Sequence, residues 1–355
     1  MLAETTTGTR PRTHRPTVAR TVLAVPILAV IVIGVGVVAL AIGRFYVPLG
    51  HVVDILGSTV AGLPDTAPQV EHSVVLLVRL PRVLLALLVG GGLAIAGAAL
   101  QATFRNPLVS PEIIGVSAGA SFGGALALML GLGSAFLVGG AFAFGLAALG
   151  LLVVVTLGRA ATPMLMVVLG GVVVGSFFSA LVSLVTYLAD PYTTLPAIVF
   201  WLLGSVATAT YASVLTALIP ILAGAGMLIM LRWRINVLSL GDEDAASVGL
   251  QPARMRWVVL ISAALIVAGA VAVSGVISWV GLVIPHLARM LVGPDHRVLL
   301  PASFLIGAAY LIMIDTLSRS VTAGEIPLGV ITALVGAPVF FVLLRRNRDR
   351  IWDRA

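Results

Sequence analysis

Apolar residues occur in runs of about 20 along most of this 355-residue chain, and short polar stretches separate the runs. A helix rises about 1.5 Å per residue, so a run of that length crosses the hydrocarbon layer of a bilayer. The pattern therefore predicts an all-α, polytopic membrane protein with ten spanning helices. The expected spans are residues 21–43, 82–104, 111–130, 134–157, 163–188, 212–231, 257–277, 279–291, 299–317 and 327–344.

Three of these spans, 111–130, 279–291 and 327–344, are short or are interrupted by Gly and Pro. Transporters place pathways at such breaks, because the freed backbone groups need a cavity or a partner. A further short helix is expected within residues 192–210. The rest of the polar sequence, above all residues 44–78, is expected to form connections.

The composition supports a membrane protein, with 60% hydrophobic and only 10% charged residues. A soluble domain of this size needs far more surface charge. We predict one membrane domain, residues 21–344, between a disordered basic tail at 1–20 and a basic tail at 345–355. The net charge of +7 comes from arginines that flank the apolar runs, so it indicates membrane orientation and not nucleic-acid binding.

The basic residues also predict the orientation of the chain. All 21 are arginine, and all but four fall on one side of the ten-span arrangement. Because cytoplasmic loops carry the excess of positive charge, that side and both termini are predicted to be cytoplasmic. The four arginines on the opposite, external side are Arg44, Arg79, Arg82 and Arg319.

Two residue types are absent, and each absence excludes a class of chemistry. Without lysine the chain cannot carry a Walker A phosphate loop, so ATP hydrolysis would need a separate subunit. Without cysteine it has no disulfides and no thiolate metal sites. His286 has no second metal-ligating residue nearby in the sequence, so no metal or other cofactor is expected. No paired catalytic groups occur at membrane depth, so the chain is not expected to be an enzyme.

The most informative stretch is residues 79–124. It opens with RLPR at 79–82, breaks at RNP, residues 105–107, and restarts at SPE, residues 110–112. Serine as N-cap, proline at the first position and an acid in the first turn predict a helix start there. Glycines then recur four residues apart, which leaves a stripe where another helix, or a substrate, can approach the backbone closely. They are Gly115, Gly119 and Gly123.

These motifs, with GAALQ, RNPL, IGVSAGA, LGDEDA, GLVIPHLAR, DHRVLLPAS and EIPLGVITALVGAPVF, resemble the FecCD family in order and spacing. The family contains permease subunits of ABC importers for iron chelates, haem and vitamin B12. The resemblance implies a homodimer in the bacterial plasma membrane, surrounded by lipid. It also implies two ABC ATPase subunits inside and a substrate-binding protein outside.

The resemblance implies roles for three groups of residues. Arg79, Arg82 and Arg319 match arginines that receive carboxylates of the substrate-binding protein, although lipid phosphates are the alternative partner. The loop at 236–256 matches the segment that couples to the ATPase, through Leu240, Gly241, Asp242, Glu243, Asp244 and Ala245. Its acids also favour the first turn of a short helix that Gly249 can end.

The third group concerns the pathway. The turn at Thr162 and Pro163 matches an inner gate of the family. Gly171, Gly175 and Ser179 are small residues of span 163–188 that suit either a wide passage or close helix packing.

The implied cargo is a ferric siderophore, with haem, cobalamin and molybdate as alternatives within the family. An ion-coupled secondary transporter is the alternative from another class. It would use Asp315, an acid within an expected span, as its ion site. The alternative is that Asp315 has a local structural partner, since Ser318 and Arg319 follow it closely.

Overall fold

The computed structural model describes residues 18–62, 67–156, 164–322 and 324–346, and the regular elements in these ranges are helices. Seven helical stretches are long and apolar enough to cross a membrane. The helices of these stretches are α1 (Val18–Ala41), α4 (Leu80–Thr103), α6 (Ser134–Thr156), α7 (Met164–Leu188), α9 (Tyr211–Met230), α12 (Pro252–Ser274) and α14 (His296–Val321).

Three shorter apolar helices complete the expected set: α5 (Val116–Met129), α13 (Val280–Val292) and α15 (Leu328–Arg346). Each of the ten predicted spans therefore corresponds to a helix, and the three spans expected to be short are the short ones. The all-α membrane prediction is confirmed. The predicted tails fall largely on residues 1–17 and 347–355, which lie outside the described residues.

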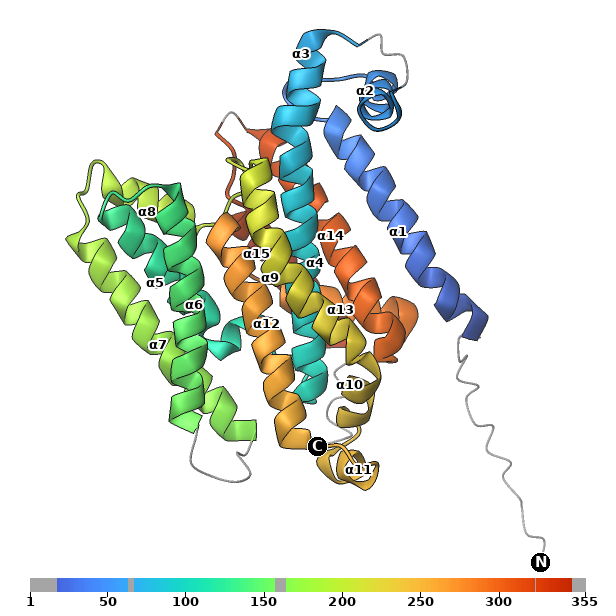
Figure 1. Cartoon of the computed structure of the whole chain (residues 1–355), viewed down its shortest axis with the longest axis vertical. Helices are drawn as coiled ribbons and strands as arrows, with labels where there is room; N and C mark the ends of the chain where they lie inside the picture. Colours follow the sequence, from blue (N-terminus) through green and yellow to red (C-terminus); the bar gives the residue numbers. More distant parts are fainter. Residues whose placement is uncertain (1–17, 63–66, 157–163, 323, 347–355) are drawn as a thin grey trace, which may run out of the picture.

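Helix α4 lies at the centre of the bundle and packs against α14, α12, α9 and α13 (Figure 1). Its glycines allow this close packing. A Cβ atom at Gly97 would collide with the carbonyl oxygen of Gly281 on α13, and one at Gly90 with that of Gly307 on α14. Small residues let helix backbones approach inside a membrane, where packing rather than the hydrophobic effect holds helices together.

Helices α5, α6 and α7 form a second group at one side of the bundle, and α1 lies at the opposite side (Figure 1). Two glycines of the predicted stripe, Gly119 and Gly123, lie between α5 and α6. A Cβ atom at Gly119 would lie 2.5 Å from the carbonyl oxygen of Phe144, and one at Gly123 would collide with that of Gly140. The prediction that this stripe admits another helix is confirmed.

Residues 44–78 differ from the expected connection. They contain α2 (Leu49–Ala61), α3 (Gln69–His72) and a π-helical segment, Ser73–Arg79, which runs directly into α4. The N–H group of Leu80 bonds to the carbonyl of Val75, the spacing of a π-helix. We attribute the error to Pro81, which lacks an N–H group and lies just before the expected start of the span at residue 82. The π-helical turn lets the helix continue through it.

The bundle has two distinct ends (Figure 1). One end, which we call the α2 end, carries α2, α3 and α8 (Thr194–Leu202), the short helix expected within 192–210. The other, the α11 end, carries α10 (Arg232–Leu238) and α11 (Asp242–Ser247).

Candidate functional site

The three arginines singled out from the sequence lie together at the α2 end. Arg79, Arg82 and Arg319 are only 4%, 5% and 6% exposed. With Asp315 and Glu325 they form a group that we call the arginine cluster. Its members come from the end of the π-helical segment, the start of α4, the last third of α14 and the segment before α15.

Arg82 binds both acids of the cluster. Its Nε donates to Oδ1 of Asp315 at 2.7 Å, while Nη1 and Nη2 donate to Oε1 and Oε2 of Glu325 at 3.0 and 2.7 Å. A guanidinium that grips a carboxylate with two parallel bonds makes one of the stronger polar contacts in proteins. The hydrogen bonds from Arg82 hold the pKa of Glu325 below its ordinary value.

Arg79 and Arg319 bind the end of α1. Arg79 Nη1 donates to the carbonyl oxygens of Leu40 at 2.6 Å and Ala41 at 3.0 Å, and Arg319 Nη2 donates to that of Ala39. These carbonyls lie in the last turn of α1, where intrahelical donors run out. The cluster therefore ties α1, α4, α14 and the start of α15 to one another.

This geometry bears on two predictions. All three arginines point into the protein and bind groups of the same chain, so an external carboxylate meets no free guanidinium in this state.

The second prediction concerns Asp315 as an ion site. Its side chain is 1% exposed and paired with Arg82, and its Oδ2 lies 3.6 Å from Nε of Arg319. An acid held by two arginines is already neutralised, which argues against an ion-coupling role.

The predicted coupling segment, residues 240–245, lies at the α11 end. Helix α11 begins at Asp242, and Gly249 follows it with φ 80°, as the sequence indicated. Asp242 Oδ1 accepts a hydrogen bond from Arg256 of α12 and lies 3.7 Å from Nη2 of Arg105. Arg105 follows directly after α4 and has φ 50°. Asp242 therefore links α11 to two long helices.

The coupling segment presents a mixed outer surface. Leu240 is 70% exposed and Val248, just beyond α11, is 57% exposed. Glu243 and Asp244 are also exposed, while Gly241 and Ala245 are buried. The segment therefore leaves both aliphatic and acidic side chains uncovered at the α11 end.

A second set of bonds holds α10 against the start of α14, and the sequence reasoning missed it. Asn236 Nδ2 donates to Oδ1 of Asp295 at 2.7 Å, and the backbone N–H of His296 donates to Oδ1 of Asn236 at 2.9 Å. Asp295 also caps α14 by accepting from the N–H of Arg297. An aspartate before an apolar run was the available signal for this cap.

The break before α5 differs from its prediction. Ser110 makes no side-chain cap bond, and Pro111–Ile114 form a 3-10 turn instead of the first turn of an α-helix. The chain turns at Gly115, with φ 81°, before α5 begins at Val116. Gly115 takes this left-handed conformation because it packs against the backbone of α7 at Gly171 and Gly175.

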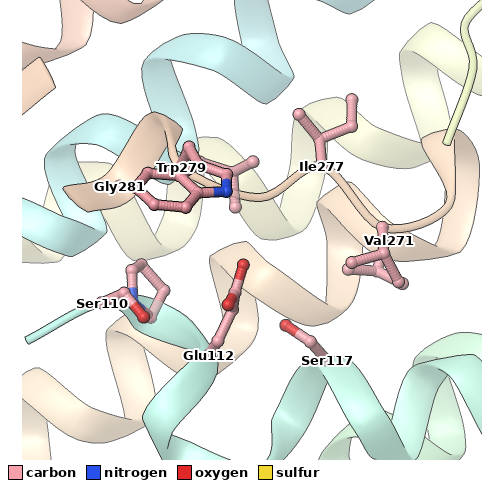
Figure 2. Close-up of a pocket in the computed structure, with 10 residues that line it drawn as sticks. Ser110, Glu112, Ser117, Val271, Ile277, Trp279 and Gly281 are labelled. Atoms are coloured by element: carbon pink, nitrogen blue, oxygen red, sulfur yellow. The ribbon is translucent and has the colours of Figure 1, made fainter. Parts of the chain in front are cut away.

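A small hollow lies between this break and the start of α13 (Figure 2). The carboxyl group of Glu112 points toward the ring of Trp279, and Ser117 lies beside it. The cavity measures about 10 Å³, room for a single water molecule. It is too small for a metal chelate. Its lining residues are Leu93, Ser110, Pro111, Glu112, Ser117, Val271, Val276, Ile277, Trp279 and Gly281.

Helix α7 has two different faces. A Cβ atom at Gly171 would collide with the carbonyl of Ile113, and one at Gly175 would lie 3.7 Å from Cα of Gly115, so these glycines serve packing. Ser179 lies on the exposed face, with large apolar residues such as Leu169. Thr162 and Pro163 lie outside the described residues.

Comparison with known proteins identifies the family. Residues 28–346 match the model of the FecCD transport family. The chain belongs to this family. It is 43% identical to the molybdate import system permease protein MolB of Haemophilus influenzae, across 86% of the chain and 90% of MolB. It is 41% identical to a probable iron chelatin transport system permease of Helicobacter pylori, across 78% of the chain and 83% of that protein.

A solved structure supports the same conclusion. The FecCD chain superimposes with a TM-score of 0.82 on a metal-chelate type ABC transporter in an inward-facing conformation. The two are 41% identical, and the match covers 91% of this chain and 98% of the other. The protein is therefore a multi-pass permease subunit of an ABC importer and not an enzyme. ATP hydrolysis belongs to a separate subunit, which agrees with the missing Walker A lysine.

Proposed function

We propose that this permease works as a homodimer in the bacterial plasma membrane, with two ATPase subunits on its α11 end and a substrate-binding protein on its α2 end. Surrounding lipid covers the remaining apolar surface. The cycle of the ATPase would alternate the access of a pathway between the two permease copies.

The surface of the coupling segment carries this proposal. It is exposed, combines aliphatic and acidic side chains, and is fixed by Asp242 to Arg105 and Arg256. A partner that moves α11 would therefore move the ends of α4 and α12. Since α4 is the central helix of the bundle, such a movement would reach most other helices.

Charge supports the orientation. The described part of the α11 end is rich in arginine, and positive charge favours the cytoplasmic side. These residues are Arg105, Arg232, Arg234, Arg254, Arg256 and Arg297. At the α2 end, Arg79, Arg82 and Arg319 are neutralised or hydrogen-bonded inside the arginine cluster.

The exposed face of α7 supports a pathway between two copies. The hollow at the helix breaks is too small for cargo, whereas α7 exposes Ser176, Ser179 and Ser183 among large apolar residues. Uncharged hydroxyl groups can form transient hydrogen bonds with a passing solute without holding it tightly. The apolar residues beside them would pack against the second copy.

We propose a metal compound as the cargo, with two candidates. A ferric siderophore is the cargo implied by the motifs, and an iron chelatin permease is among the relatives. Molybdate is the second candidate, because a molybdate permease shares 43% identity over nearly its full length. Uptake by cells that express the complete system distinguishes the two candidates. Radioactive molybdate and a radioactive ferric siderophore are each offered in competition with the other compound.

The absence of cysteine permits a direct test of orientation and assembly. In intact cells, a membrane-impermeant maleimide should label Asp54→Cys on α2 but label Ser247→Cys on α11 only after lysis. Bifunctional reagents should join two copies through Ser179→Cys on α7. The matched control is Ile33→Cys, exposed on α1 at the opposite side of the bundle, which should stay monomeric. Reversed labelling, or equal cross-linking of both variants, would contradict the proposal.

A further inference from the structure

The two acids that bind Arg82 differ in their freedom to leave it. Asp315 lies within α14, and its side chain is 1% exposed. Glu325 lies outside the helices, three residues before the start of α15 at Leu328, and its side chain is 27% exposed. Only Glu325 can move toward solvent without disturbing a helix.

The balance of charge in the arginine cluster predicts that, when Glu325 leaves Arg82, another carboxylate takes its place. The cluster contains three arginines and two acids. Removal of the Glu325 carboxylate would leave Arg82, Arg319 and Arg79 with Asp315 as the one acid of the cluster. Because an unpaired buried charge is costly, this arrangement would take up another carboxylate.

The segment that carries Glu325 is held by a few specific bonds. The Ser318 hydroxyl donates to the carbonyl of Ile326 at 2.6 Å, and Arg44 donates to that of Thr322 at 2.8 Å. Just beyond it, the N–H of Leu328 donates to the carbonyl of Gly204 at 2.8 Å. The N–H of Gly329 likewise donates to the carbonyl of Leu203 at 3.0 Å. The two bonds from Arg82 to Glu325 add a charged side-chain link to these bonds.

We infer that Glu325 occupies, within the same chain, the position that an acidic side chain of an external protein partner takes on docking. The incoming carboxylate displaces Glu325 from Arg82, and the released segment loosens the start of α15. This inference rests on the proposed docking of a substrate-binding protein at the α2 end. It explains how buried arginines serve a docking surface, and it links docking to movement of a spanning helix.

A binding measurement on the full chain in phosphatidylcholine nanodiscs tests this exchange. The probe is a fluorescent oligoglutamate peptide, whose affinity is read by anisotropy. Glu325→Gln removes the internal competitor, so the peptide should bind about tenfold more tightly than to the wild type. Asp54→Asn removes one acid from α2 at the same end, outside the cluster, and should leave the affinity unchanged. Equal affinity for the wild type and Glu325→Gln would overturn the exchange.

A second readout follows the segment itself. A nitroxide label at Gly324→Cys, where a side chain meets open space, should become more mobile in Glu325→Gln than in the Glu325 form. In the Glu325 form, addition of the peptide should raise the mobility to the same level. If the mobility of the label does not respond to the peptide, Glu325 only stabilises the segment before α15, and the exchange is wrong.

A third variant separates failure of the exchange from failure of docking. The double variant Arg82→Gln, Asp315→Asn removes the guanidinium group of Arg82 and, at the same time, the charge of its buried partner Asp315. If the peptide binds this variant as well as the wild type, docking at Arg82 is wrong and the exchange falls with it. If binding is lost here but is equal for the wild type and Glu325→Gln, docking stands and the exchange alone is wrong.

Discussion

At the scale of single residues, the burial of charge distinguishes this protein most clearly. Arg82 and Asp315 are both almost fully buried and lie 2.7 Å apart, although 233 residues separate them in the sequence. Buried ion pairs are expensive to form, but the loss of one partner costs more because the other charge is then left alone. The arginine cluster therefore behaves as a unit.

Asp315→Asn should destabilise the protein strongly. The substitution leaves Glu325 as the one acid bound to Arg82, and it removes the carboxylate that lies near Arg319. The expected decrease in the free energy of unfolding is about 3 kcal/mol. Unfolding in mixed dodecyl sulfate micelles measures this difference. Adding Arg82→Gln to Asp315→Asn should recover part of the loss, since no uncompensated Arg82 charge then remains. A single variant as stable as the wild type would contradict the buried pairing.

Sequence reasoning reached part of this description. Arg79, Arg82 and Arg319 stood out because arginine is unusual on the external side, and Asp315 because an acid within a span is rare. The pairing of Asp315 with Arg319, four residues later, agrees with the local partner that the sequence suggested. The burial of the arginines and the bonds from Arg82 to Asp315 and Glu325 could not be predicted, because these bonds join segments more than 200 residues apart. Glu325 was read only as part of a motif. The available signal was an acid at the same predicted membrane depth as unmatched arginines.

At the scale of helices, close backbone approach governs the packing. The regular spacing of Gly119 and Gly123 predicted a groove on α5, and α6 occupies it. The break at Gly115 was not predicted, because it depends on the backbone of α7, which the local sequence does not encode. The same limit applies to the π-helical turn before Pro81.

Gly123→Val should weaken the contact between α5 and α6. Its side chain would collide with the backbone of Gly140, and forced repacking of this kind costs about 1–3 kcal/mol. The matched control is Gly139→Val on α6, where a new Cβ atom has no atom within 4 Å. Thermal unfolding should show a lower midpoint for Gly123→Val and little change for the control. Equal midpoints would contradict the packing.

Asp242→Asn should loosen α11. Its ion pairs with Arg256 and Arg105 are partly exposed, and such pairs contribute about 1 kcal/mol or less, so α11 should stay folded but become more mobile. A nitroxide label at Ser247→Cys measures the mobility. With the ATPase present, less transport per ATP hydrolysed is expected. Glu243→Gln, an exposed neighbour, should leave the mobility of the label unchanged. The reverse pattern would contradict the role of Asp242.

At the scale of the whole molecule, most of the architecture followed from hydrophobicity alone. Runs of apolar residues located a helix for each of the ten expected spans, and seven of these helical stretches are long enough to cross a membrane. The arrangement of the spans around α4 came only from the structure, since many spans are equally apolar. The surfaces proposed for the second copy and for cargo, on the exposed face of α7, are equally hard to predict because lipid and protein contacts select similar residues.

The central claim is that this chain is a permease driven by a separate ATPase. Reconstitution into proteoliposomes tests it most directly, with radioactive molybdate and a radioactive ferric siderophore as solutes. The permease with its ATPase, ATP and substrate-binding protein should accumulate one of them against its gradient, and omission of the ATPase should abolish accumulation. Uphill uptake by the permease alone, driven by an ion gradient, would contradict the account.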